Sequence, residues 1–291
     1  MKKLLLGAVA LAAIGVAPAL AADLAAPVYT KAPPPVVATY DWTGFYAGAN
    51  VGYSWGQWNA TSNQAIFNFE SNTAKPKPDG WLGGIQAGYN RQFSNPWVLG
   101  IEADIQGTGE KASQAWTDPG VAPTTCPPGF FGTPPNCIPP AQSFVPQRPG
   151  AGPATLSSTW NFPWFGTIRG RVGVTPDAER KWLLYVTGGL AVGESDYSFS
   201  WSNPGGAPGR QAYGMSSNQT LWGWAVGGGV EAALWGNWTA KAEYLYVDLG
   251  TQSIYTTDVD GAPFSVQNKV RDQIFRVGVN YRFAGPVVAK Y

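Results

Sequence analysis

The chain has 291 residues, with 19 basic side chains, 18 acidic side chains and no histidine, which is enough for one large domain or two ordinary ones. Aromatic residues make up 14% of it and charged residues only 13%; the charged share is about half the usual one and suits a surface that meets lipid. The near-neutral charge gives no reason to expect a nucleic-acid partner. Without histidine, the chain lacks the usual general base and the commonest metal ligand, so we expect no enzyme, no bound metal and no cofactor.

The N-terminus has the pattern of a secretory signal peptide over residues 1–21. Lys2 and Lys3 precede an apolar run that starts at Leu4, and small residues up to Ala21 form a cleavage site. The run is too short and too rich in Ala and Gly for a transmembrane anchor, and no later stretch is apolar enough for a spanning helix. We expect export and cleavage after Ala21, which removes two of the 19 basic residues and leaves 17 against 18 acidic ones.

Two Pro-rich stretches follow the signal. Residues 22–40 are predicted to be an extended periplasmic lead-in, and residues 108–158 a long loop that holds 11 of the 25 prolines. This loop contains Cys126 and Cys137. In the oxidising compartment that export implies, we expect them to form a disulfide that contributes about 3 kcal/mol.

Period-two alternation of apolar with small or polar residues indicates β-strands. Eight segments show it: 45–55, 81–91, 97–106, 164–174, 182–192, 222–231, 238–244 and 275–283. The segment 182–192 has four consecutive apolar residues, Leu183 to Val186, so its facing is ambiguous. Eight strands of about ten residues match the length of strand that crosses a bilayer at a tilt.

The connections between these segments alternate strictly between short and long. The short ones are 93–96, 175–181 and 234–238, and the long ones are about 56–79, 108–158, 195–218 and 250–267. This alternation is typical of outer-membrane barrels. The sequence therefore predicts an all-β fold: an eight-stranded antiparallel transmembrane β-barrel over residues 41–283, with short periplasmic turns and four long external loops.

Register across the short turns predicts which faces are inside. If Leu234 pairs with Trp238, Glu231 lies opposite Lys241, and opposite charges meet. The same argument at the first short turn sets Gln86 opposite Asp104. A face with many glycines and paired charges suits a narrow, filled lumen better than the interface of a soluble sandwich.

Nine charged side chains occupy the alternate strand positions that are predicted to face the lumen, and they form the candidate site. They are Glu102, Asp104, Arg169, Arg171, Glu231, Lys241, Glu243, Arg276 and Arg282. An eight-stranded barrel is just wide enough for its own side chains to fill. We expect a structural network of paired charges; a weak or gated polar path is the alternative.

Several motifs resemble those of one family, the outer-membrane immunogenic proteins, which are small Gram-negative surface barrels often grouped with porins. The motifs are Trp42–Gly48, Gly80–Gly84, Trp238–Tyr246 and Val279–Phe283. The resemblance covers Trp42 to Phe283 and implies a structural or surface role in the outer membrane. The second external loop is longer than the family's usual one, so the resemblance assigns it no function.

The resemblance also implies partners. Outer-membrane lipid surrounds such barrels, and the barrel-assembly machinery recognises a C-terminal signal ending in an aromatic residue. Tyr281 and Phe283 match that signal, but residues 284–291 follow as a tail, so either Phe283 or Tyr291 ends it. An unknown external partner is expected for the loops.

Three functions remain open at the level of sequence. The first is a structural and surface-display role in the envelope of a Gram-negative bacterium. The second is a small diffusion porin, and the third is an adhesin that acts through its external loops. Phe130 and Phe131 in the Cys-containing loop form either an adhesive tip or a local cluster under the disulfide.

Overall fold

Alternating side chains place nearly all of the described chain in β-strands. The computed structural model describes residues 39–63, 73–93, 96–118, 154–202, 212–257 and 263–283. Within these ranges the strands are β1 (Gly44–Gly56), β2 (Asn59–Ser62), β3 (Thr73–Ala74), β4 (Asp79–Gln92), β5 (Trp97–Asp118), β6 (Ala154–Val174), β7 (Trp182–Ser202), β8 (Ala212–Ala233), β9 (Trp238–Thr257) and β10 (Pro263–Arg282). No helix in these ranges is long and apolar enough to cross a bilayer.

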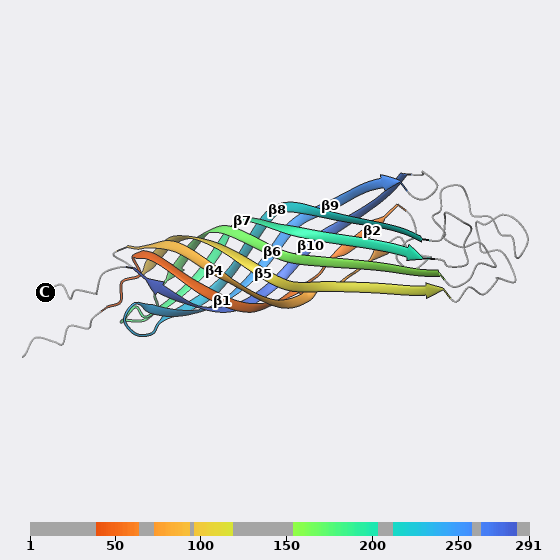
Figure 1. The fold of residues 1–291 in the computed structure, drawn as a ribbon. Coiled ribbons are helices and arrows are strands. Elements are labelled where there is room, and N and C mark those ends of the chain that lie inside the picture. Colours follow the sequence, from red (N-terminus) through yellow and green to blue (C-terminus); the bar gives the residue numbers. More distant parts are fainter. Residues whose placement is uncertain are drawn as a thin grey trace, which may run out of the picture. The chain divides into compact units, whose positions relative to one another are not determined.

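The strands form a closed antiparallel barrel. They pair in the order β1-β4-β5-β6-β7-β8-β9-β10, and β1 also pairs with β10, which closes the sheet (Figure 1). β2 continues β1 along β10, and β3 pairs with β2 just before β4 begins. The ten described strands therefore make a barrel of eight strands around, which confirms the predicted fold class.

Both registers that the sequence predicts are confirmed. Glu231 pairs with Lys241 across β8 and β9, and Gln86 pairs with Asp104 across β4 and β5. The short turns begin with the expected backbone bonds: the N–H of Leu234 donates to the carbonyl of Trp238 at 2.9 Å, and the same bond at the first turn is 3.0 Å. A two-residue period leaves little choice, because a slip of one residue would turn every lipid-facing side chain inward.

Outward-facing side chains define an apolar belt between two aromatic girdles. The girdle at the short-turn end contains Phe45, Trp97, Trp182, Trp238 and Phe283, and the upper girdle contains Trp55, Trp81, Trp222, Tyr246 and Phe275. Between them lie exposed aliphatic residues such as Ile85, which is 64% exposed. We call the part of the barrel inside this belt the membrane section.

The strands are longer than the sequence analysis predicts. The expected loop 108–158 is wrong at both ends, because β5 continues to Asp118 and β6 begins at Ala154. The other long connections are also shortened by strand residues. Beyond the upper girdle the barrel continues as what we call the outer section: β2, β3 and residues 107–118, 154–163, 193–202, 212–220, 247–257 and 263–272.

These extensions escaped prediction because their polarity is inverted. In the outer section most of the large inward side chains are apolar and most of the outward ones are polar; Phe199 and Trp201, for example, are buried between exposed serines of β7. A search for lipid-facing apolar residues does not detect this pattern. The facing of the ambiguous segment is also settled here, since Leu183 and Tyr185 point inward while Leu184 and Val186 are exposed.

Two irregularities let individual strands change facing between the sections. In β6 the inward residues are Phe162 and then Phe165, with a register shift around Pro163, which cannot donate a ladder hydrogen bond. In β9 the inward positions pass from Leu249 to Gln252 across Gly250. Gly250 has φ 78°, a left-handed backbone that glycine adopts at little cost.

Candidate functional site: the filled lumen

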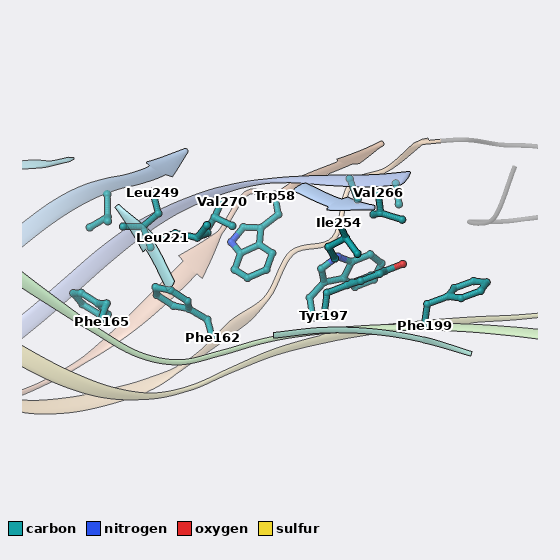
Figure 2. Close-up of a cluster of buried hydrophobic side chains, with 14 of the residues drawn as sticks. Trp58, Phe162, Phe165, Tyr197, Phe199, Leu221, Leu249, Ile254, Val266 and Val270 are labelled. Carbon is teal, nitrogen blue, oxygen red and sulfur yellow. The ribbon is translucent and has the colours of Figure 1, made fainter. Parts of the chain in front are cut away.

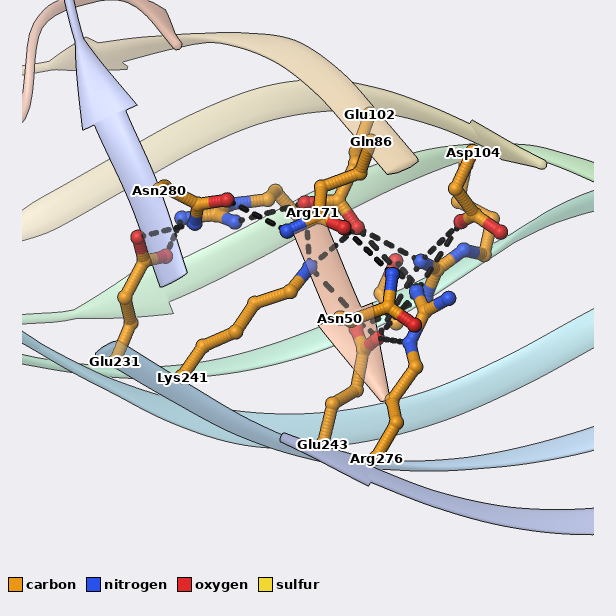
Figure 3. A network of polar contacts seen from close by, with 12 residues as sticks. Asn50, Gln86, Glu102, Asp104, Arg171, Glu231, Lys241, Glu243, Arg276 and Asn280 are labelled. Atoms are coloured by element: carbon orange, nitrogen blue, oxygen red, sulfur yellow. Dashed lines mark hydrogen bonds and ion pairs between the residues drawn. The ribbon is translucent and has the colours of Figure 1, made fainter. Parts of the chain in front are cut away.

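A network of polar side chains fills the lumen of the membrane section (Figure 3). Each of the eight strands around the barrel contributes at least one member: Tyr46, Gln86, Glu102, Arg169, Tyr185, Glu231, Lys241 and Arg276. Four carboxylates meet four cations, and their side chains are at most 3% exposed. The network is therefore neutral, as burial of so many charges requires.

Glu102 is the hub of this network. Its two carboxylate oxygens accept hydrogen bonds from Lys241 Nζ at 2.8 and 2.9 Å. Arg169 donates to Oε1 at 2.8 Å, and the Tyr46 hydroxyl donates to Oε2 at 2.8 Å. Lys241 lies on β9 and Glu102 on β5, so this contact crosses the lumen and joins opposite walls of the barrel.

Asp104 and Glu243 hold the two central arginines. Asp104 Oδ2 accepts from Arg169 at 2.9 Å and from Arg276 at 3.1 Å. Glu243 accepts from Arg169 Nη1 at 3.0 Å and from Arg276 Nε at 2.8 Å. Two arginines shared between the same two carboxylates form a closed, charge-assisted ring that fixes all four side chains.

Glu231 has a partner that the register does not predict. Arg171 Nη2 donates to Glu231 Oε2 at 2.7 Å, while Thr239 and Asn280 donate to Oε1 at 2.6 and 2.8 Å. The expectation that Lys241 is the partner of Glu231 is therefore wrong, although the two residues are cross-strand neighbours. In a narrow lumen a long side chain reaches the opposite wall as easily as the adjacent strand, so register fixes Cα neighbours and not ion-pair partners.

The structure sets Arg282 apart from the other eight charged residues. It lies at the short-turn end, where its guanidinium stacks on the Tyr40 ring at 4.4 Å and donates to the Thr43 carbonyl at 3.4 Å. Among the described residues, no carboxylate oxygen lies within 4.0 Å of its guanidinium nitrogens. Arg282 therefore belongs to the mouth of the barrel at the short-turn end.

The segment before β1 closes that mouth. Trp42 is 1% exposed and packs against Val98, Leu183 and Tyr185. Its indole N–H donates to the Arg180 carbonyl at 2.8 Å. Residue Tyr40, expected to end the lead-in, instead belongs to the barrel mouth, because its N–H donates to the carbonyl of Glu179 at 2.8 Å.

An apolar cluster fills the lumen of the outer section (Figure 2). Its members include Trp58, Trp160, Phe162, Phe165, Tyr197, Phe199, Leu249, Ile254, Val266 and Val270. Some of the polar groups inside it are paired with each other; for example, the Trp160 indole N–H donates to Asn268 Oδ1 at 3.1 Å. The nine inward charges of the sequence analysis do not indicate this layer, and the serine-separated aromatics of β7 are the signal that would have found it.

Two buried acids at the junction of the layers were also missed. Asp272 lies one residue beyond the upper girdle, opposite Gly56, and accepts a hydrogen bond from the indole of Trp58 at 3.2 Å. Burial raises the pKa of Asp272 from 3.8 to about 7. Burial, together with the nearby Asp272, also raises the pKa of Glu110 well above 4.5. Both residues lie at alternate positions that face inward, but Glu110 fell inside the predicted loop 108–158, and Asp272 fell between the predicted loop that ends at 267 and the predicted strand that begins at 275.

The remaining predicted sites have limited structural description. Cys126 and Cys137, the signal peptide 1–21 and the tail 284–291 lie outside the described residues, so the disulfide stays a prediction. Tyr281 and Phe283 lie on the outer face at the short-turn end, with ring centroids 5.3 Å apart. Within the described ranges no group of three or more Asp, Glu or Cys side chains is arranged to hold a metal ion.

Comparison with known proteins identifies the family. Residues 7–283 match the family model described as the outer membrane protein beta-barrel domain. The 31 kDa outer-membrane immunogenic protein of Brucella melitensis is 32% identical over 288 residues, which are 97% of this chain and 100% of that protein. The 22 kDa outer membrane protein of Rhizobium leguminosarum is 27% identical over 79% of this chain and 74% of its own.

Among solved structures, OprG from Pseudomonas aeruginosa has a TM-score of 0.42 and 11% identity, over 86% of this chain and 100% of OprG. That likeness is too distant to carry an argument about function. The family model and the Brucella relative place the chain in the outer membrane of a Gram-negative bacterium. This chain belongs to the outer-membrane β-barrel family that includes the outer-membrane immunogenic proteins.

Proposed function

We propose that the chain serves as a closed structural barrel of the outer membrane and displays its long connections at the cell surface. The observation that carries this proposal is the continuous filling of the lumen. Trp42 and Tyr40 occupy the periplasmic mouth, the neutral network occupies the membrane section and the apolar cluster occupies the outer section. Three successive layers with different chemistry leave no evident path for an ion.

The alternative of a small diffusion porin needs a continuous polar path. The network supplies polar groups only over the membrane section, where they are already engaged with each other. Above it, an ion would have to pass aromatic side chains such as Trp58 and Phe162, which are each 1% exposed. The cost of stripping water from an ion in such a layer argues against passage.

Planar-bilayer recordings test the proposal. Folded protein, verified by its heat-modifiable migration on a gel, is expected to give no discrete conductance steps. Trp42→Gly removes the mouth closure but leaves both deeper layers, so we expect it to be equally silent. Reproducible single-channel steps from the wild type, or a current that rises in Trp42→Gly, would favour the porin.

The display role is supported by the length of the outer section. β5 runs eleven residues beyond Gly107, so its tip stands about 25–30 Å above the upper girdle for a tilted strand. The apolar cluster gives this extension its own packed core. The alternative is an adhesin whose connections bind an external partner. Binding of labelled whole cells to host-surface components, with and without residues 119–153, distinguishes adhesion from display.

We also propose that the chain has no enzymatic activity and that the barrel-assembly machinery recognises Tyr281 and Phe283. The lack of histidine and the full engagement of the lumen carboxylates with cations both oppose catalysis. Lipase, protease and acyltransferase assays on folded protein test the first point. The outward, exposed rings of Tyr281 and Phe283 support the second, and loss of assembled barrel in Phe283→Ala cells tests it.

A further inference from the structure

Four cations form a grid on the outer wall of the outer section, immediately above the upper girdle. We call them the basic grid: Lys75, Lys77, Lys269 and Arg271. Asn59 pairs with Lys269, and the N–H of Gln57 donates to the carbonyl of Arg271 at 2.8 Å. Both Asn59 and Gln57 are exposed, so the cations beside them on β10 share the outward face.

The other side of the grid follows from the same register. Ala60 pairs with Ala74, and the backbone bonds from Trp58 to Pro76 and from Gly56 to Pro78 continue this pairing. Asn59 is therefore beside Lys75, and Gln57 is beside Lys77. With strands about 4.8 Å apart and alternate residues about 7 Å apart, the four Cα atoms mark a rectangle of about 10 by 7 Å. Lysine and arginine side chains are long enough to converge on one anion from such corners.

A hollow of about 420 Å³ lies against three of the four cations of the grid. It is lined by Lys75, Lys77 and Arg271 on its sides and by Tyr246 and Gln273 on the side nearest the belt. On the membrane side of the grid, Gln273 has two aromatic residues of the upper girdle as its cross-strand neighbours: Trp55 on β1 and Tyr246 on β9. The hollow therefore opens at the level where lipid head groups begin.

Positive charge on the outer section is confined to this wall. The outward cations among its described residues are the basic grid and Lys111, which is the cross-strand partner of Asp79 and so offsets it. Arg271 is paired with Asp248 at 2.9 Å, and Asp272 lines the hollow from the lumen side. Four cations thus face two carboxylates. On the opposite wall β7 carries Glu194 and Asp196 and no described cation.

We propose that the basic grid binds the phosphate groups of a phosphorylated glycolipid in the outer leaflet. A multiply charged phosphate group matches an excess of cations that have space to converge, and basic residues at a membrane interface recognise anionic head groups. The adjacent aromatic girdle fixes the depth at which the acyl chains of the same lipid would lie along the belt. The proposal depends on the outer-membrane location and is independent of whether the lumen conducts.

Lipid titration followed by native mass spectrometry tests the proposal on folded, full-length mature protein in detergent. The probes are diphosphorylated lipid A, the same lipid with both phosphates removed, and inorganic phosphate. The variants are Lys75→Gln with Lys77→Gln, and Lys269→Gln with Arg271→Gln. The matched control is Arg91→Gln with Lys181→Gln, which removes two exposed cations at the short-turn end.

We expect diphosphorylated lipid A to bind the wild type and the control with equal affinity. Each grid variant should lose roughly ten- to thirtyfold in affinity, because it lacks the electrostatic attraction that two basic residues contribute near an anionic surface. Equal binding of the dephosphorylated lipid would overturn the proposal, and so would an equal loss in the control, which would indicate a net-charge effect. If inorganic phosphate binds the grid as tightly as the lipid does, the site takes free phosphate and the lipid assignment is wrong.

Discussion

Lys241→Met provides a sharp test of how the lumen is held together. Lys241 makes two hydrogen bonds to Glu102, at 2.8 and 2.9 Å, from the opposite wall of the barrel. Its register neighbour Glu231 is instead held by Arg171 at 2.7 Å. Removing the ammonium group leaves Glu102 with one cation fewer in a dry interior, and we expect a loss of about 3 kcal/mol in the free energy of unfolding.

A double-mutant cycle decides which carboxylate depends on Lys241. Glu102→Gln and Glu231→Gln each restore neutrality when combined with Lys241→Met, so overall charge is the same in the two double variants. We expect a coupling energy of about 2–3 kcal/mol between Lys241 and Glu102, and less than about 1 kcal/mol between Lys241 and Glu231. The measurement is urea unfolding of the barrel in lipid vesicles, followed by tryptophan fluorescence.

The control is Lys181→Met. Lys181 pairs with Glu179, but both side chains are more than half exposed, at 54% and 51%, so we expect almost no change in the free energy of unfolding. Equal coupling of Lys241 to Glu102 and Glu231 would refute the geometric argument and show that only net lumen charge matters. An unchanged unfolding midpoint in Lys241→Met would show that water reaches the network, and the porin hypothesis would gain.

Three further predictions concern the outer section. Because burial raises the folded-state pKa of Asp272 to about 7, the folded barrel binds this proton more tightly than the unfolded chain; stability should fall as pH rises from about 4 to 7, by up to about 4 kcal/mol. Urea midpoints at pH 4 and pH 8 measure this change, and Glu110→Gln should reduce it. Protease added to intact cells should cut only within 119–153 on the second connection and spare the lead-in 22–40; cleavage of the lead-in would reverse the orientation. Gly250→Val forces a β-branched residue into φ 78° and should cost about 1–3 kcal/mol. The control is Gly188→Val, at an exposed β7 position where an added Cβ would meet its nearest neighbours only at 3.6 and 3.9 Å.

The sequence by itself determined the barrel, its two faces and its register. The reason is that a lipid-facing strand must be apolar at every second position, so the pattern in segments such as 81–91 leaves one facing. Short turns then set the pairing, and Glu231 opposite Lys241 follows by counting. All nine predicted lumen charges could be found in this way, because their alternate positions along the strands face inward, and eight of them join the network in the membrane section.

Tertiary structure alone decided which of those charges bind each other. Lys241 on β9 crosses the lumen to Glu102 on β5, and Arg171 on β6 reaches past β7 to Glu231 on β8, because a narrow barrel brings strands that are not neighbours within the length of one side chain. The pairing of neighbouring strands does not predict such contacts. The structure also decided where the barrel ends. Above the upper girdle water replaces lipid, so the outward positions of the alternating pattern become polar and apolar side chains turn inward. Only the closed sheet reveals that Trp160 and Phe199 face a common interior.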